Sequence, residues 1–223
     1  MIGPASVVVA LLQFGILATL VEAGRQRNVA AAVNALVALA VTLLPWALER
    51  AAVFVAGPAL PLWLGVAGLL HAIGMLGPYD SVWWWDHVTH FVSAALVAAL
   101  FHAVVVVGYA GAAPFGAVPA ATVLLTFAAG ILWELGELIA RELGEQFDIE
   151  PVLVHYGWID TLLDLGFDLV GAVLVVLFDL RVFVPLAERV AGPNRRLVLW
   201  GVVAVVVGSV LLVLLITALR IER

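Results

Sequence analysis

Long apolar stretches alternate with short polar segments along the whole chain. A helix of about 20 residues crosses a hydrocarbon layer of ~30 Å, so each apolar stretch predicts one transmembrane helix. Charged residues together with Gly, Pro or Asn gather in the breaks between the stretches. The pattern therefore predicts an all-α, polytopic transmembrane helical bundle of about seven spans, with six as the lower count. The expected spans are residues 4–22, 29–48, 53–77, 87–109, 116–140, 159–180 and 197–219.

Two features of the breaks refine this picture. Pro58 and Pro61 fall inside the third stretch, where proline lacks the N–H that a helix interior needs, so we expect this helix to be kinked or shortened. The longest expected loop, residues 141–158, is too short to hold a soluble domain. We therefore expect one transmembrane domain over residues 1–223, with its polar site in the helices between residues 79 and 172.

Composition agrees with the pattern and excludes several function classes. Hydrophobic residues make up 65% of the chain and charged residues 12%, which is typical of a multi-pass protein of the cell membrane. A net charge of −6 argues against nucleic acid as a partner. The chain has no cysteine, which excludes disulfides, thiolate metal sites and a cysteine nucleophile.

Three clusters of acidic and histidine residues interrupt the apolar pattern. They span residues 86–90, 134–137 and 160–168. Following the direction of each expected helix puts all three clusters on the same side of the membrane, whichever way the protein faces. Arginine is divided evenly between the two sides, so the positive-inside rule does not fix the orientation.

Within each cluster the polar residues share one helix face. Residues three or four apart are neighbours on a helix surface, as are Asp86 with His90 and Glu134 with Glu137. Helices that follow one another in sequence usually pack together, so these faces are expected to surround a shared cavity. The third cluster descends about 6 Å into the membrane with each step of four residues. Its members are Asp160, Asp164 and Asp168.

The carboxylates of these clusters need compensation. Each aspartate near the middle of a membrane costs about 2.5–3.5 kcal/mol on insertion scales, so several together would cost on the order of 10 kcal/mol. Only Arg141 and the two histidines of the first cluster are expected nearby as cations. Protonation, a bound divalent metal or a water-filled pocket would each remove the cost. Histidine and carboxylate ligands without sulfur suit Zn²⁺, Mn²⁺, Fe²⁺, Mg²⁺ or Ca²⁺.

Structural roles are the simpler interpretation for several polar and aromatic residues. Acids at helix starts act as caps, loop acids face water, isolated histidines form ordinary hydrogen bonds, and tryptophans anchor the membrane interface. The expected caps are Asp80, Asp86 and Asp160, and the expected loop acids are Glu142, Glu145, Asp148 and Glu150. The isolated histidines are His71, His102 and His155, and the tryptophan belt contains Trp83, Trp84, Trp85 and Trp158.

The order and spacing of the three motifs resemble the YjdF-like family of bacterial and archaeal polytopic integral membrane proteins. The resemblance covers residues 79–172 and implies a membrane fold and a residue set, but no reaction. Trp133 stands where the family has tyrosine, and Gly157 stands where it often has another acid. His87 and Asp168 have no counterpart, which makes them weaker site candidates. The matching residues are Asp86 with His90-Phe91, Glu134 with Glu137, and Asp160-Thr161 with Asp164 and Gly171-Ala172.

The mixed histidine and carboxylate chemistry favours a metal-dependent membrane enzyme. It would be a hydrolase or transferase acting on a lipid or lipid-linked substrate, with a glutamate as a candidate base toward metal-bound water. Neither the Glu-x-x-His pair of di-iron bundles nor a His-Glu-x-x-His motif occurs, so the pattern assigns no catalytic residue. The candidate metal ligands are Asp86, His90, Glu134, Glu137, Asp160 and Asp164.

Two other functions fit the same residues. The stripe from Asp160 to Asp168 would form the entry half of a pathway in a proton or cation transporter. Its weakness is the segment from Leu169 to Phe178, which has no ionisable residue. Alternatively, the clusters would join helices in a structural or binding subunit, since the small residues of these helices permit close packing.

Overall fold

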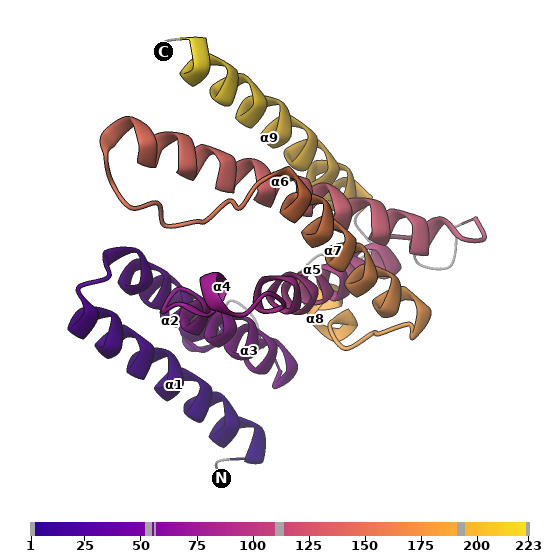
Figure 1. Cartoon of the computed structure of the whole chain (residues 1–223). Coiled ribbons are helices and arrows are strands. Elements are labelled where there is room, and N and C mark those ends of the chain that lie inside the picture. Colours follow the sequence, from indigo (N-terminus) through magenta and orange to yellow (C-terminus); the bar gives the residue numbers. More distant parts are fainter. Residues whose placement is uncertain (1–2, 52–54, 56, 110–113, 191–194, 222–223) are drawn as a thin grey trace. The chain divides into compact units, whose positions relative to one another are not determined.

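The apolar stretches form helices close to the expected bounds. The computed structural model describes residues 3–51, 55, 57–109, 114–190 and 195–221. Within these residues the chain forms nine α-helices and no strand, which confirms the all-α class (Figure 1). The helices are α1 Pro4–Gln26, α2 Val29–Arg50, α3 Ala59–Gly74, α4 Pro78–Ser81, α5 Trp85–Tyr109, α6 Ala117–Phe147, α7 Trp158–Leu177, α8 Val184–Val190 and α9 Arg195–Ile221.

All seven expected stretches form helices, and α4 and α8 are short additions between them. Four of the described helices, α1, α2, α5 and α6, are long and apolar enough to cross a membrane by themselves. Helix α3 and the segment Val207–Thr217 of α9 are shorter apolar helices. Helix α7 is 20 residues long but carries three aspartates, which sets it apart from an ordinary lipid-facing span.

Two helix ends differ from the expectation. Helix α3 begins after Pro58, as expected from the prolines, and residues 52–54 and 56 lie outside the described part of the chain. Helix α6 continues to Phe147 instead of ending near residue 140. It therefore contains Glu142, which is only 7% exposed, so the prediction of a solvated acidic loop is wrong for this residue. The segment is rich in Glu, Leu and Arg, which favour helix, and the helix ends at Asp148 with φ of 53°.

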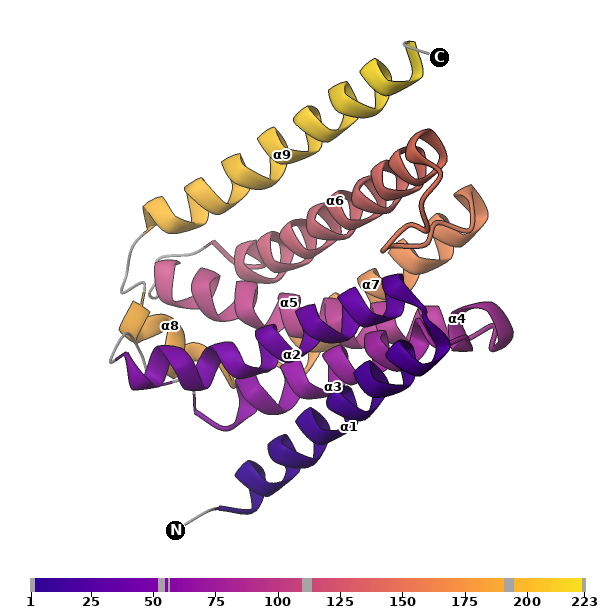
Figure 2. The same cartoon turned by 90° about the vertical axis from the view of Figure 1, so that its left-hand side faces the viewer.

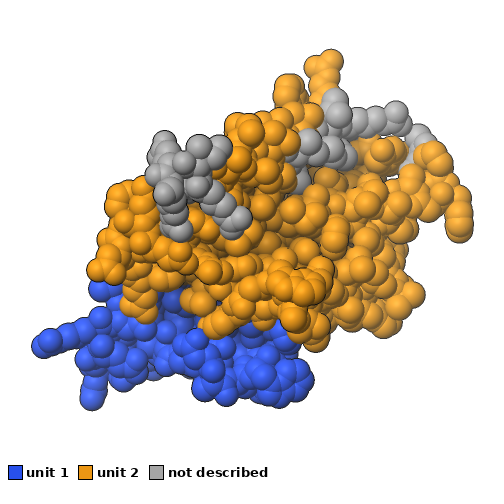
Figure 3. All heavy atoms as spheres, turned by 45° about the horizontal axis from the view of Figure 1, so that its top comes forward, with its two compact units in different colours: residues 1–89 blue, residues 90–223 orange. Residues whose placement is uncertain are grey.

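Contacts divide the chain into two compact units, residues 1–89 and residues 90–223 (Figure 3). In the first unit, α1, α2 and α3 lie side by side (Figure 2). Their core contains Ile16, Ala35, Ala38 and Ala72. Small residues dominate this core, which allows the three helices to approach closely. The expectation of a single domain stays a prediction.

In the second unit, α6 packs against both α7 and α9. Helices α5 and α7 also approach closely, because a Cβ added at Gly171 would lie 2.8 Å from the Phe91 carbonyl oxygen. Gly130 likewise allows α6 to approach α7, because a Cβ added at this position would collide with the Asp168 carboxylate. These glycines let polar side chains of three helices meet inside the unit.

Candidate metal centre

The centre of the polar site is His90, near the start of α5, which is 5% exposed. Its Nδ1 atom lies 3.2 Å from Oδ1 of Asp168 on α7. Its Nε2 atom lies 3.9 Å from Oε1 of Glu134 on α6. Three helices therefore contribute one buried polar side chain each, as the expected packing of consecutive helices requires.

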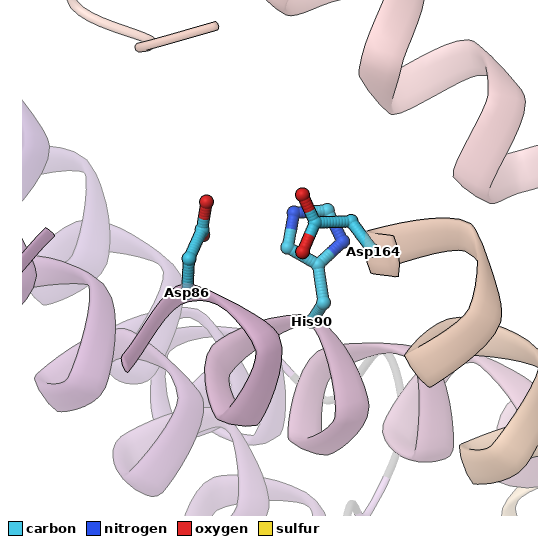
Figure 4. A group of neighbouring side chains, drawn as sticks. All are labelled: Asp86, His90 and Asp164. Atoms are coloured by element: carbon cyan, nitrogen blue, oxygen red, sulfur yellow. The ribbon is translucent and has the colours of Figure 1, made fainter. Parts of the chain in front are cut away.

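Asp164 completes this group from α7, one helical turn before Asp168. It is 1% exposed, and one of its carboxylate oxygens lies within 4.8 Å of a ring nitrogen of His90. Figure 4 shows Asp164 beside His90, with Asp86 extending from the same side of α5 one turn earlier. Asp86 belongs to the unit of residues 1–89. His87, in the same unit, is buried and has an edge contact with Trp83.

The aspartates of α7 follow the expected stripe. Asp160 is half-buried in the first turn, whereas Asp164 and Asp168 are 1% and 4% exposed. The N-cap of α7 is Gly157, with no side-chain cap hydrogen bond, so Asp160 is not the capping residue. An acid in the first turn still benefits from the positive end of the helix dipole.

A second group lies on α6 and in the loop that follows it. Ligand atoms of Glu134, Glu137 and His155 all lie within 4.8 Å of one another. The indole Nε1 of Trp133 donates a 2.8 Å hydrogen bond to Oε1 of Glu137. Burial and the charge of Arg141 lower the pKa of His155, while Asp160 acts in the opposite direction. The net shift favours neutral imidazole, which is the form that binds metals.

The buried charge of this unit is strongly one-sided. Among the residues that the structure describes, no arginine is buried, and the chain contains no lysine. Arg141 has a side chain that is 49% exposed, and it pairs with Glu145 at 3.0 Å. A bound cation is one way to balance buried carboxylates that have no buried arginine beside them. The buried acids are Glu134, Glu137, Glu142, Asp164 and Asp168.

Five of the six predicted ligands lie in the unit of residues 90–223, and four of them gather around His90 and Glu134. Their role as ligands stays a prediction. The four are His90 with Glu134 and Asp164, and Glu137 beside Glu134. Asp160 lies one turn outside them on α7, and Asp86 lies one turn before His90 on α5.

The structure places two further residues, Asp168 and His155, beside the predicted ligands. Asp168 had no counterpart in the resemblance, yet it hydrogen-bonds to His90. Its place at the end of an acidic stripe was the signal. His155 is isolated in sequence, which predicts an ordinary hydrogen-bonded histidine. Nothing in the local pattern indicated that its loop returns to α6.

His102 forms a separate polar cluster farther along α5. Its Nδ1 atom lies 3.2 Å from the Thr122 hydroxyl, and its Nε2 atom lies 2.8 Å from Oδ1 of Asp179. Arg181 donates a 2.7 Å hydrogen bond to the other carboxylate oxygen of Asp179. The hydrogen bonds from Arg181 and then His102 hold the pKa of Asp179 below its ordinary value.

Comparison with known proteins shows that the chain belongs to a family of membrane proteins. The family described as "Predicted membrane protein (DUF2238)" matches residues 6–184, which is most of the chain. This match agrees with the resemblance to YjdF-like membrane proteins. No curated protein and no solved structure matches. Together with its apolar helices, the match identifies an integral membrane protein that is embedded in a lipid bilayer.

Proposed function

We propose that this chain, which belongs to the DUF2238 family of membrane proteins, is a metal-dependent membrane enzyme. In this proposal it is a hydrolase or transferase of the cell membrane, and its substrate is a lipid or a lipid-linked molecule. One divalent cation is held by His90, Glu134 and Asp164. Asp168 positions the imidazole of His90, and Asp160 lies one turn nearer the start of α7 than Asp164.

The geometry around His90 carries the proposal. A histidine that ligates a metal usually donates its other ring N–H to a carboxylate, as Nδ1 of His90 can do toward Asp168 at 3.2 Å. The 3.9 Å between Nε2 and Glu134 is longer than a hydrogen bond. It is shorter than about 4.0–4.4 Å, twice the usual distance from zinc to nitrogen or oxygen ligands. The two atoms are therefore spaced as neighbouring ligands of one cation.

The position of the site supports a lipid substrate. His90 lies in the second turn of α5, and Asp164 lies in the second turn of α7, so both are near helix ends. Trp158, the first residue of α7, is 71% exposed, as expected of an interfacial anchor. A cation at this depth is close to lipid headgroups, where it would polarise an ester or phosphoryl oxygen and activate water.

Elemental analysis of purified protein tests the proposal. The wild type and the variants His90→Gln, Glu134→Gln and His102→Gln are purified in detergent without chelators, and thermal unfolding checks that each is folded. We expect bound divalent metal in the wild type and in the matched control His102→Gln. We expect loss of that metal in the other two variants. A folded wild type without metal, or equal metal in all four proteins, would contradict the proposal.

One observation favours proton or cation transport as a second candidate. Thr126 and Thr122 of α6 are 1% and 0% exposed, and they continue the buried face of Glu134 toward His102. Helix α7 has no polar side chain beyond Asp168, so the two threonines of α6 are the buried polar groups that could continue a pathway there. A flux assay in proteoliposomes distinguishes the candidates, because transport requires Thr126 and Asp168. Equal flux in wild type, Thr126→Val and Asp168→Asn would exclude it.

A further inference from the structure

We infer that the centre binds two divalent cations, and that Glu134 is the ligand they share. The second cation is held by Glu134, Glu137 and His155. This inference rests on the proposed metal site at His90 and extends it to a dinuclear centre. Paired cations act as a clamp on the attacking and leaving oxygens of a substrate, which a single cation cannot do.

The donors of the second site converge from two separate segments. Glu134 and Glu137 are three residues apart on α6 and therefore share a face, while His155 comes from the loop before α7. Their ligand atoms lie within 4.8 Å of one another. Two ligands on opposite sides of one cation are about 4.0–4.4 Å apart for zinc and about 4.6–5.2 Å apart for calcium. Shifts of a few tenths of an ångström would therefore close the group around a cation.

Glu134 is placed to serve both cations. Its Oε1 atom lies 3.9 Å from His90, and the same side chain belongs to the group with Glu137 and His155. A carboxylate has two oxygens, each with its own lone pairs, so it can bind a cation through each of them. The two donor groups thus meet at one side chain.

The backbone after α6 fixes the position of the histidine. Asp148 adopts φ of 53° and ends the helix, and Ile149 N–H bonds back to the Gly144 carbonyl at 3.0 Å. This turn needs glycine at position 144. A Cβ there would lie 2.9 Å from the Ile149 carbonyl oxygen and 3.3 Å from Pro151. The loop therefore packs against α6, which returns His155 to the level of Glu137.

Glu137 is oriented in the way that metal-binding carboxylates usually are. Trp133, one turn earlier on α6, donates a hydrogen bond to Oε1 of Glu137 at 2.8 Å. Such a bond fixes the rotamer of a ligating carboxylate and directs its second oxygen. This gives Trp133 a positioning role in addition to its expected interfacial one.

The charge of the group also favours a second cation. Glu134 and Glu137 are 4% and 7% exposed on the same helix face, so two carboxylates are desolvated side by side. The nearest arginine along α6, Arg141, is half-exposed and pairs with Glu145. A cation bound at His90 would be compensated by Glu134 and Asp164, which leaves Glu137 for a second cation.

Titration with Mn²⁺ and electron paramagnetic resonance test the inference. We expect two Mn²⁺ per chain in the wild type, with the broadened spectrum of a spin-coupled pair. His155→Gln and Glu137→Gln should each retain one Mn²⁺ and show the six-line spectrum of an isolated ion. His102→Gln, which alters a histidine outside the centre, should behave like the wild type.

The outcomes separate this inference from the proposed function. One Mn²⁺ in the wild type, lost in His90→Gln and unchanged in His155→Gln, would overturn the second site and leave the first. No Mn²⁺ in a folded wild type would overturn both. Gly144→Ala provides a second variant with all ligands intact, and it should weaken only the second equivalent, because it moves the loop that carries His155.

Discussion

Of the three buried histidines of helix α5, His90 and His102 have similar surroundings and different ring contacts. His90 and His102 are 5% and 2% exposed, and each lies against an aspartate, Asp168 within α7 or Asp179 just after it. Both ring nitrogens of His102 are within hydrogen-bond distance of an oxygen. At His90, Nδ1 lies 3.2 Å from Oδ1 of Asp168 and Nε2 lies 3.9 Å from Oε1 of Glu134.

This difference separates a structural histidine from a candidate ligand. A carboxylate only accepts hydrogen bonds, so the 2.8 Å contact with Asp179 requires a proton on Nε2 of His102. A protonated nitrogen cannot bind a metal. Asp179 is also compensated by Arg181, and its side chain is 53% exposed. Asp168 has a side chain that is 5% exposed and lies among other acids, which is the negative charge that the proposed cation would balance.

The largest expected effect is on metal affinity. His90→Gln removes a nitrogen ligand, so affinity for Zn²⁺ or Mn²⁺ should fall by more than about 100-fold, beyond the ~10–100-fold typical of outer-shell changes. His102→Gln should leave it unchanged. Competition with a chromogenic chelator measures both constants. Equal affinities in the two variants would remove the distinction between the histidines.

The aspartates extend the same comparison. Asp168→Asn keeps the ligands but weakens the hold on the His90 ring, so metal affinity should fall about 10–100-fold without loss of stoichiometry. Asp179→Asn should have no effect on metal binding. The same chelator competition measures both. A change in stoichiometry in Asp168→Asn would instead make Asp168 a ligand.

Much of the fold followed from local pattern. The expected spans correspond to described helices because desolvated backbone in a membrane must be helical. Pro58 and Pro61 predicted a kinked or shortened third helix, and α3 begins at Ala59, directly after Pro58. The end of α6 was missed because charged residues were interpreted as a loop. Glu142 is instead buried on a continuing helix, where Glu and Leu are good helix formers.

Helical periodicity predicts which site residues share a helix face, but not which tertiary contacts they form. Spacing placed His90, Glu134 and Asp164 on faces that consecutive helices could bring together. The contact between Asp168 and His90 depends on the space that Gly130 leaves, which is a tertiary property. His155 depends on the αL conformation of Asp148 and the path of the loop. The periodicity of the sequence predicts neither the contact between Asp168 and His90 nor the position of His155.

The two helical glycines Gly130 and Gly136 of α6 test that space directly. Ala at position 130 would push its Cβ into the Asp168 carboxylate, so we expect a stability loss of about 1–3 kcal/mol and weaker metal binding. Gly136 has nothing within 4 Å, so Gly136→Ala should raise stability by about 0.5–1 kcal/mol. Thermal unfolding in detergent measures both effects. Stabilisation by both substitutions would show that Asp168 is not held against α6.

The smallest effect belongs to the His102 region and depends on pH. Arg181 and then His102 lower the pKa of Asp179 from its ordinary 3.8, so this carboxylate stabilises the fold above pH 3.8. Its contribution disappears as pH falls through the lowered pKa of the folded state. Because the side chain is half-exposed, the contribution is at most about 1 kcal/mol. Unfolding of wild type and Asp179→Asn in chelator should therefore differ at neutral pH and converge in acid. A difference that grows in acid would contradict the ion pair and its structural role.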